Sequence, residues 1–388
     1  MRRMEGGAEV MIIEQVVGAA IVLIFLADIF LTVLYARAGT GLLAPRWNRL
    51  VWVLLRSFSE PFGRYRGAIL SFGGPLIVIL LIVFWALGLT VGAALIIQPE
   101  LGGAIRPSSG NTPRDFVTAL LAAGNSLSIV GSGDYSPHTS GTRILYLINS
   151  LIGASVLSLV LSYLVQVYSA LRERNALALT VDTMTDCTGA AARALSALGS
   201  DGKFQGGYSE LANLASSLER VKEAHHFYPL LFYFRFPDPR YSVSRVCFVV
   251  LDLATLIHTA LDQERLGWLA KSSAVTRLRH DGNLLLKTLE IGLPTLGREL
   301  GEQRDQADRA KAHYRASCHE LERTGLAAKI PDESRYLAER HQWERRILSV
   351  APVLGYTVED VTSADRSMPT ERDQEPAFSN SIKANRTR

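Results

Sequence analysis

The sequence has few of the residues that mark a metal site, a disulfide-stabilised domain or a familiar enzyme class. It holds three cysteines in 388 residues, Cys187, Cys247 and Cys318, which are far apart and form no C-x-x-C pair. Neither a zinc site nor a disulfide framework is therefore predicted. The sequence also lacks a phosphate-binding loop, a nucleophile elbow, an H-E-x-x-H motif and a kinase signature. These absences predict a protein that is not an enzyme and has no cofactor.

A strong net charge is also missing. The chain has 41 Lys and Arg against 37 Asp and Glu, a formal net charge of +4. Such a balance offers no basic surface for nucleic acid, so no nucleic-acid partner is expected. No G-x-G-x-x-G follows an expected strand in the second half, so a nucleotide-binding regulatory domain is not predicted there.

Charge is almost absent from three long apolar runs: residues 15–36, whose one charge is Asp28, and residues 67–97 and 144–170, which have none. As a helix, residues 67–97 would reach roughly 46 Å at about 1.5 Å per residue, enough to cross a ~30 Å hydrocarbon core with tilt. We therefore predict three transmembrane helices. A cleaved signal peptide is the alternative for residues 1–36, but the apolar stretch is long for one and no A-x-A site precedes the basic loop.

Basic residues between the first two runs predict the orientation. Short cytoplasmic loops collect Lys and Arg, and this loop has one acid, Glu60, against Arg37, Arg46, Arg49, Arg56, Arg64 and Arg66. The amino terminus and residues 98–143 should then lie outside, and the chain from Arg172 inside, in a bacterial plasma (inner) membrane. Residues 45–59 place apolar side chains among arginines, which predicts a helix on the cytoplasmic membrane surface, in contact with membrane lipid.

Asp28 is the exception within the first apolar run. An unpaired carboxylate there costs about 2.5–3.5 kcal/mol or more. Asp28 is therefore expected to face protein or to be protonated, with an arginine of the following loop as a possible partner. Helix anchoring and a part in gating are both open roles for it.

A short helix is predicted over residues 116–127. Thr112 is a candidate cap, Pro113 suits a first helical position, and Asp115 is a candidate capping-box acid. About 12 residues cannot span a bilayer, so this helix should enter and leave on one side. The partial negative charge of its carboxyl end would favour a cation.

The segment after this helix is the most informative part of the chain. Ile129-Val130-Gly131-Ser132-Gly133-Asp134 lies between the short helix and the third apolar run. Two glycines around one residue let backbone carbonyls turn toward a central axis and replace the water shell of a cation. One such loop cannot enclose an ion, so a cyclic homotetramer is expected.

These residues, with the Gly-Asp-Tyr-Ser-Pro exit at 133–137, resemble the pore module of two-transmembrane potassium channels and their prokaryotic ligand-gated relatives. The resemblance is close over residues 116–175 and loose from residue 67. It implies a potassium-channel-like protein that passes K⁺ or another monovalent cation, with a filter formed by the carbonyls of residues 130–133 and Asp134 at its outer mouth.

Two filter positions depart from the family pattern T-V-G-Y-G. Ile129 replaces the threonine whose hydroxyl would add an oxygen ring, unless Ser128 substitutes for it. Ser132 replaces the bracing tyrosine, and Leu121 and Ala122 offer no aromatic partner on the short helix. A looser filter with uncertain selectivity is expected. Two functions stay open: a conducting cation channel, or a non-conducting, pore-derived membrane scaffold or sensor.

The third apolar run should line the inner pore. Gly153, in its middle, is a candidate gating hinge, with close helix packing as the equal alternative. The polar candidates for the pore lining are Asn149, Ser150, Ser155, Ser158 and Ser162.

The second half of the chain is predicted to be a helical cytoplasmic domain, with its clearest helices at 208–223 and 246–261. His225 and His226 precede Pro229, where a helix end with exposed histidines is commoner than a metal site or a pH sensor. The fold class is an all-α membrane protein with three transmembrane helices, a re-entrant pore helix and a filter loop. We divide it into 1–66 (first span and basic segment), 67–171 (pore module), 172–363 (helical domain) and 364–388 (disordered tail).

Overall fold

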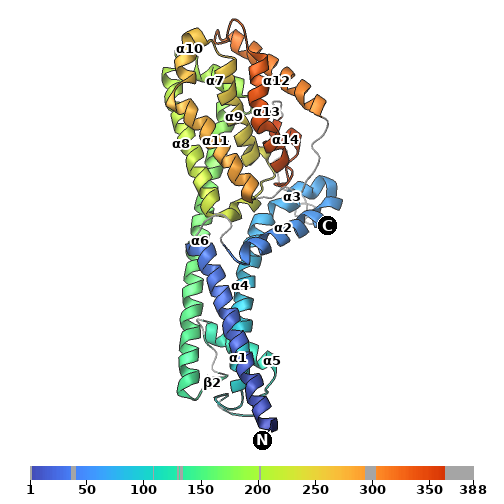
Figure 1. Ribbon diagram of the computed structural model, residues 1–388, viewed down its shortest axis with the longest axis vertical. Helices are drawn as coiled ribbons and strands as arrows, with labels where there is room; N and C mark the ends of the chain where they lie inside the picture. Colours follow the sequence, from blue (N-terminus) through green and yellow to red (C-terminus); the bar gives the residue numbers. More distant parts are fainter. Residues whose placement is uncertain are drawn as a thin grey trace, which may run out of the picture. The chain divides into compact units, whose positions relative to one another are not determined.

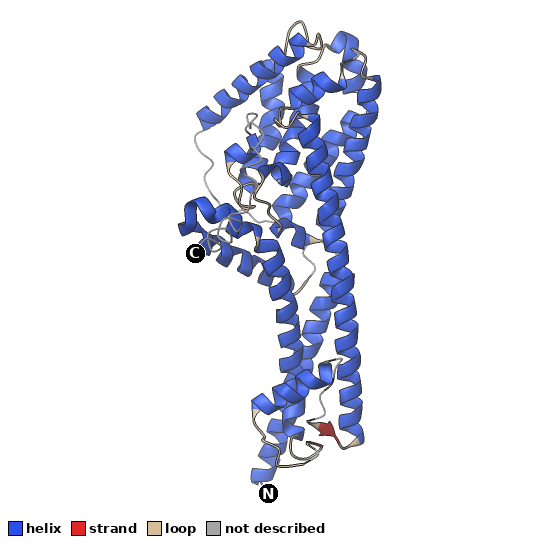
Figure 2. Ribbon diagram, turned by 180° about the vertical axis from the view of Figure 1, so that it is seen from behind, coloured by secondary structure: helices blue, strands red, loops and turns tan. Residues whose placement is uncertain are grey.

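The structure is a computed structural model that describes residues 2–35, 41–107, 109–128, 131, 134–200, 202–292 and 303–362. The described residues are almost entirely helical, with one pair of two-residue strands among them (Figure 2). The all-α fold class is thereby confirmed. The expected tail at 364–388 lies outside the described residues.

The chain forms two compact units. The membrane unit comprises Met1–Leu171 and His225–Arg235, and the C-terminal unit comprises Arg172–Ala224 and Phe236–Arg388. The elements that begin in the membrane unit's first stretch are α1 (Arg2–Ile29), η1 (Phe30–Leu34), α2 (Ala44–Ser59), η2 (Glu60–Tyr65), α3 (Arg66–Ser71), α4 (Gly73–Ile97), η3 (Gln98–Glu100), β1 (Ile105–Arg106), α5 (Phe116–Leu127), β2 (Ser136–Pro137) and α6 (Ser140–Met184).

Within the part of the chain that the structure describes, three helical segments are long and apolar enough to cross a bilayer: Glu9–Leu34, Gly73–Glu100 and Ser140–Met184. They fall on the three predicted runs, and Figure 1 shows α1, α4 and α6 running side by side in the membrane unit. The run predicted over 67–97 is divided at Phe72 into α3 and α4. The third helix continues without interruption for 45 residues.

α1 packs on α4 through glycines. A side chain at Gly18 would bring its Cβ to 2.6 Å from the carbonyl oxygen of Gly92, and one at Gly88 would collide with the Phe25 ring. In lipid the hydrophobic effect does not drive helices together, so they associate by close packing, and small residues let two helix backbones approach closely. Any side chain at these positions would therefore push α1 away from α4.

Asp28 faces protein, one of its two expected states. The side chain is fully buried, and its carboxylate accepts hydrogen bonds from the Leu43 amide (2.6 Å), the Ala44 amide (3.2 Å) and the Trp85 indole Nε1 (2.8 Å). The amides at the start of a helix have no partner within the helix. Asp28 supplies that partner for α2 and joins three helices, so backbone amides and an indole occupy the place where an arginine was considered.

The C-terminal unit is a bundle of helices around α9. Every residue of α9 is buried except His258, the pattern of a helix enclosed on all sides, and α7, α10, α11, α13 and α14 all contact it. The elements after α6 are α7 (Ala191–Leu198), α8 (Gln205–Phe227), η4 (Pro229–Tyr233), η5 (Pro239–Tyr241), α9 (Val243–Thr259), α10 (Gln263–Ala270), α11 (Ser273–Gly292), α12 (Gln303–Arg323), α13 (Glu333–Val350) and α14 (Val358–Thr362).

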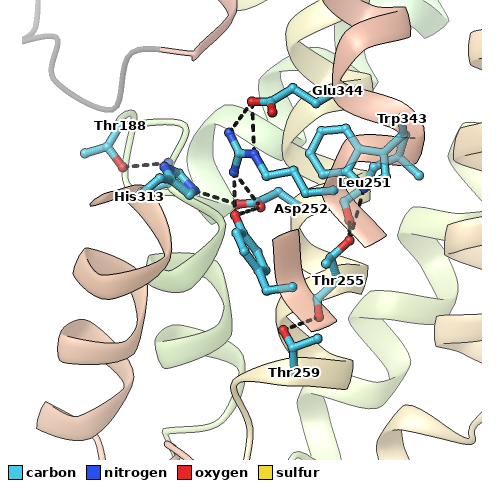
Figure 3. A network of polar contacts seen from close by, with 11 residues as sticks. Thr188, Leu251, Asp252, Thr255, Thr259, His313, Trp343 and Glu344 are labelled. Carbon is cyan, nitrogen blue, oxygen red and sulfur yellow. Dashed lines mark hydrogen bonds and ion pairs between the residues drawn. The ribbon is translucent and has the colours of Figure 1, made fainter. Parts of the chain in front are cut away.

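A buried polar network joins α9, α12 and α13 (Figure 3). Asp252 is 1% exposed and accepts hydrogen bonds from the Tyr336 hydroxyl (2.6 Å) and Arg340 Nη1 (3.1 Å), and it lies 2.8 Å from His313 Nε2. Arg340 Nη2 also reaches Glu344 at 2.7 Å. Burial by itself would raise the pKa of Asp252, but His313, Arg340 and Tyr336 outweigh burial and hold this pKa below its ordinary value.

A return segment, His225–Arg235, comes from the second half of the chain but belongs to the membrane unit. The expectation of exposed histidines is wrong for His225. Its side chain is fully buried, and its ring lies 5.5 Å from that of Phe232. α8 ends two residues later, at Phe227. The next residue, Tyr228, precedes Pro229, and helical backbone geometry is unfavourable for a residue that precedes a proline.

Candidate ion-conduction site

The pore helix α5 begins and ends where the sequence predicts, but its cap differs. Asp115 itself is the N-cap residue, and its carboxylate accepts the Thr118 amide at 2.7 Å. Thr112 and Pro113 precede the helix and are not helical, so they are not its cap and first residue. An aspartate at this position satisfies one free amide and interacts favourably with the positive end of the helix.

α5 is held against α4 by alanines. Ala119, Ala122 and Ala123 are fully buried and belong to one core cluster with Ala93 and Ala94 of α4. Methyl side chains on both helices permit close packing and leave no polar atom to satisfy. The pore helix is therefore fixed along its length by the second membrane-spanning helix.

The carboxyl end of α5 is attached to α6. The Asn149 side-chain Nδ2 donates to Ser126 Oγ at 2.9 Å, and Ser126 Oγ donates to the Ala123 carbonyl at 2.8 Å. Asn149 is 3% exposed. The prediction that Asn149 lines the pore is therefore wrong, because its side chain is buried and its amide holds the pore helix. The four serines predicted beside it, Ser150, Ser155, Ser158 and Ser162, are exposed.

Gly153 lies one helical turn beyond Asn149 and touches the same end of α5. A Cβ added at Gly153 would collide with the carbonyl oxygen of Leu127 and lie 2.9 Å from its carbonyl carbon. α6 is continuous through this position. The close approach accounts for glycine here, and the role of Gly153 as a gating hinge stays a prediction.

Of the six predicted filter residues, the structure describes Gly131 and Asp134. Ile129, Val130, Ser132 and Gly133 lie outside the described residues. Gly131 has φ +55°, and none of the described residues places an atom within 4 Å of its Cβ position. A left-handed backbone costs an L-residue roughly 1–2 kcal/mol, which glycine avoids. Asp134 is exposed.

The chain after the filter is fixed by three contacts that the sequence analysis did not identify. β2 pairs antiparallel with β1, so that Ser136 faces Arg106 and Pro137 faces Ile105. The His138 amide donates to the Ala104 carbonyl at 2.8 Å. The chain just after the predicted filter is therefore joined to the loop that follows α4.

A side chain of α6 also holds the exit. The Tyr146 hydroxyl donates to the Tyr135 carbonyl at 3.3 Å. Residues 126 and 135 are thus both attached to α6, through Asn149 and Tyr146. The segment between these points is therefore attached to α6 on both sides.

Comparison with known proteins agrees with this geometry. Residues 76–170 match a family whose description is "Ion channel". These residues belong to the two-transmembrane pore-loop ion-channel family. The ion-channel domain thus includes α5, the predicted filter and the first two-thirds of α6, and it leaves out α1, α2 and the C-terminal unit. No curated protein and no solved structure matches the chain.

Proposed function

We propose that four copies of this chain form a membrane pore that conducts monovalent cations through rings of backbone carbonyls from Val130, Gly131, Ser132 and Gly133. The observation that carries the proposal is the left-handed glycine at 131. It lies four residues after Leu127, the end of α5, in a segment that is attached to α6 on both sides. Asp134, exposed at the outer mouth, would attract cations.

Assembly is supported by what one chain leaves open. Gly131 is exposed, and no described residue comes within 4 Å of its Cβ position, which leaves room there for neighbouring copies. α6 also exposes large apolar side chains over much of its membrane length: Ile144, Leu147, Ile148, Leu151, Leu157, Leu161 and Val165. Symmetric copies around the filter would complete the carbonyl rings and cover part of this surface.

The pore is proposed to select weakly between K⁺ and Na⁺. Ile129 offers no hydroxyl for an inner oxygen ring, and Ser132 is too short to brace the filter against α5, whose Leu121 side chain is 57% exposed. Oriented dipoles still offset dehydration of a monovalent cation, so conduction is expected even though size discrimination is relaxed.

We place the basic loop and the C-terminal unit on the cytoplasmic side of the plasma membrane. α2 supports this orientation. Its start is bonded to Asp28 within α1, while Arg46, Arg49, Leu50, Leu54 and Phe58 are exposed. Apolar side chains beside arginines suit a helix lying at the boundary between acyl chains and anionic headgroups.

The test is K⁺ and Na⁺ flux into liposomes that contain the purified protein. Gly131→Ala forces a Cβ into left-handed backbone and should abolish flux. Gly141→Ala is the matched control, because a Cβ there meets no atom within 4 Å and its φ is not positive. Flux in the wild type and the control but not in Gly131→Ala supports the pore, and a K⁺/Na⁺ ratio near one supports weak selectivity. Equal, leak-level flux in all three would favour the non-conducting scaffold or sensor.

A further inference from the structure

The return segment His225–Arg235 is an excursion from the C-terminal unit into the membrane unit. The residues on either side of it, Ala224 and Phe236, belong to the C-terminal unit. Its last six residues, Leu230 to Arg235, are each 8% exposed or less. Six consecutive buried residues, one of them an arginine, are uncommon in a connecting segment, because loops usually run over the surface.

The segment contacts the start of α4. The Phe234 ring fills the place of a missing side chain at Gly74, where a Cβ would lie 2.6 Å from the ring. Arg235 Nη1 donates to the Gly67 carbonyl in α3 at 2.6 Å. A buried guanidinium needs such partners, because an unpaired one would carry a large desolvation penalty.

The same segment contacts α2 and α6. The Tyr233 ring lies 5.7 Å from Trp52 of α2, and the Phe234 ring lies 5.8 Å from Tyr168 of α6. Tyr228 also meets Tyr163 of α6 at 6.0 Å. The return segment therefore joins the start of α4 to α6 near the end of the ion-channel domain.

The start of α4 is connected to the filter by a continuous helix. Gly74 lies in the first turn of α4, and Ala93 and Ala94 near its far end pack on α5. α6 holds the carboxyl end of α5 through Asn149, and it holds Tyr135, just after the predicted filter, through Tyr146. A change in how α4 and α6 are held together at the return segment would thus reach both helices that position the filter.

We infer that the return segment couples the C-terminal unit to the pore, and that its docked state holds α4 and α6 together and restricts conduction. This regulation rests on the proposed channel function. A conformational change in the C-terminal unit would act by withdrawing the segment, to whose two ends that unit is covalently joined. The segment would thereby transmit a conformational change in the C-terminal unit to the pore.

A disulfide tests the coupling in the full chain. The contact at Gly74 puts the Cβ atoms of residues 74 and 234 within about 4 Å of each other, the separation that a disulfide requires. Gly74→Cys with Phe234→Cys should therefore form a cross-link under oxidising conditions, detectable by mass spectrometry. Liposome K⁺ flux in this variant should be lower by about fivefold or more when oxidised than when reduced. The single variant Phe234→Cys, with the three native cysteines retained, is the control and should give equal flux in both conditions.

The outcomes separate the coupling from the channel function. A cross-link that forms and leaves measurable flux unchanged, or raises it, overturns the coupling and leaves the channel. Absence of a cross-link in folded protein also overturns it. Absence of flux in every variant, wild type included, overturns both.

A second pair of variants tests the same contact if the two cysteines prevent folding. Gly74→Ala alone collides with the Phe234 ring and should release the segment and raise flux, whereas Gly74→Ala with Phe234→Ala removes the collision. Flux that rises in the single variant and falls back in the double variant supports the coupling through this contact. Equal flux in wild type and both variants overturns it.

Discussion

Arg340 should contribute more to the C-terminal unit than any exposed ion pair does, and Arg340→Met tests this. Its side chain is 4% exposed and contacts Asp252 and Glu344, whose side chains are 1% and 9% exposed. The methionine keeps much of the volume beside Phe248, whose ring lies 4.8 Å from the guanidinium carbon. It leaves the buried Glu344 carboxylate without its cation, and it leaves Asp252 with its contacts to His313 and Tyr336. Removing one partner of a buried ion pair costs about 3–5 kcal/mol.

The measurement is amide hydrogen exchange along α9 in the full-length protein. A loss of about 4 kcal/mol corresponds to exchange that is faster by roughly three orders of magnitude, if exchange there requires opening of the bundle. The matched control is Arg335→Met on the same helix. Arg335 is 52% exposed and pairs with Glu339, so its loss should cost less than about 1 kcal/mol.

A further variant separates lost charge from lost packing. Adding Asp252→Asn to Arg340→Met removes the charge of one of the two carboxylates that contacted Arg340 and should recover part of the protection. Lowering the pH should also reduce the loss of protection in Arg340→Met, because acid neutralises a buried carboxylate that has lost its cation. Equal exchange rates along α9 in Arg340→Met and Arg335→Met would refute the reasoning and show that the buried network does not stabilise the bundle.

Three further predictions concern other buried contacts. Asp28→Asn should lower the thermal unfolding midpoint in detergent. The asparagine side chain has one acceptor oxygen where the carboxylate has two, so the Trp85 indole or an α2 amide loses its hydrogen-bond partner at a cost of about 1–3 kcal/mol. An unchanged midpoint would argue against the observed contacts. Gly153→Ala should change flux through displacement of Leu127, and flux equal to that of Gly141→Ala would contradict this. The pKa of Asp252 is lower in the folded state than its unfolded value of 3.8. The stability that its carboxylate contributes is therefore fully present above pH 3.8 and is lost as the pH falls through the folded pKa. Unfolding followed by circular dichroism between about pH 4 and 2 should accordingly be less sensitive to acid in Asp252→Asn than in the wild type.

The features that could be predicted from the sequence are those set by neighbouring residues in the chain. α5 is predicted from residue 116 to residue 127 because an acid precedes it and its length is bounded by a glycine-rich segment. The spans are predicted because charge is expensive in hydrocarbon over their whole length. The division at Phe72 escapes prediction, because the residues on both sides are equally apolar.

Contacts between distant residues are not predictable in the same way. Asn149 on a membrane-spanning helix looks like a pore-lining residue, and only its distance from Ser126 shows that it holds the pore helix. Tyr336, Arg340 and Glu344 are spaced by four residues and so share one face of a helix, a signal that was available. Their partner Asp252 lies in another helix, 88 residues before Arg340.

The return segment combines both difficulties. The sequence predicts a helix end before Pro229, but the run of Leu, Phe and Tyr after this proline does not say which surface it covers. The answer depends on a glycine at position 74 that is itself unremarkable within a long apolar helix. Because the absent side chain of Gly74 and the Phe234 ring are complementary, the two residues have to be considered together.

The proposed filter has Ser132 at the position where the family pattern has a tyrosine, and the described residues that flank it are tethered. Asn149 and Tyr146 are three residues apart on α6 and hold the chain on the two sides of the filter, and residues three apart lie on one face of a helix. A displacement of α6 would therefore move both tethers together. We therefore expect the geometry of the proposed filter to follow α6. On the proposed function, a change in the contact between the return segment and α6 should then alter conduction.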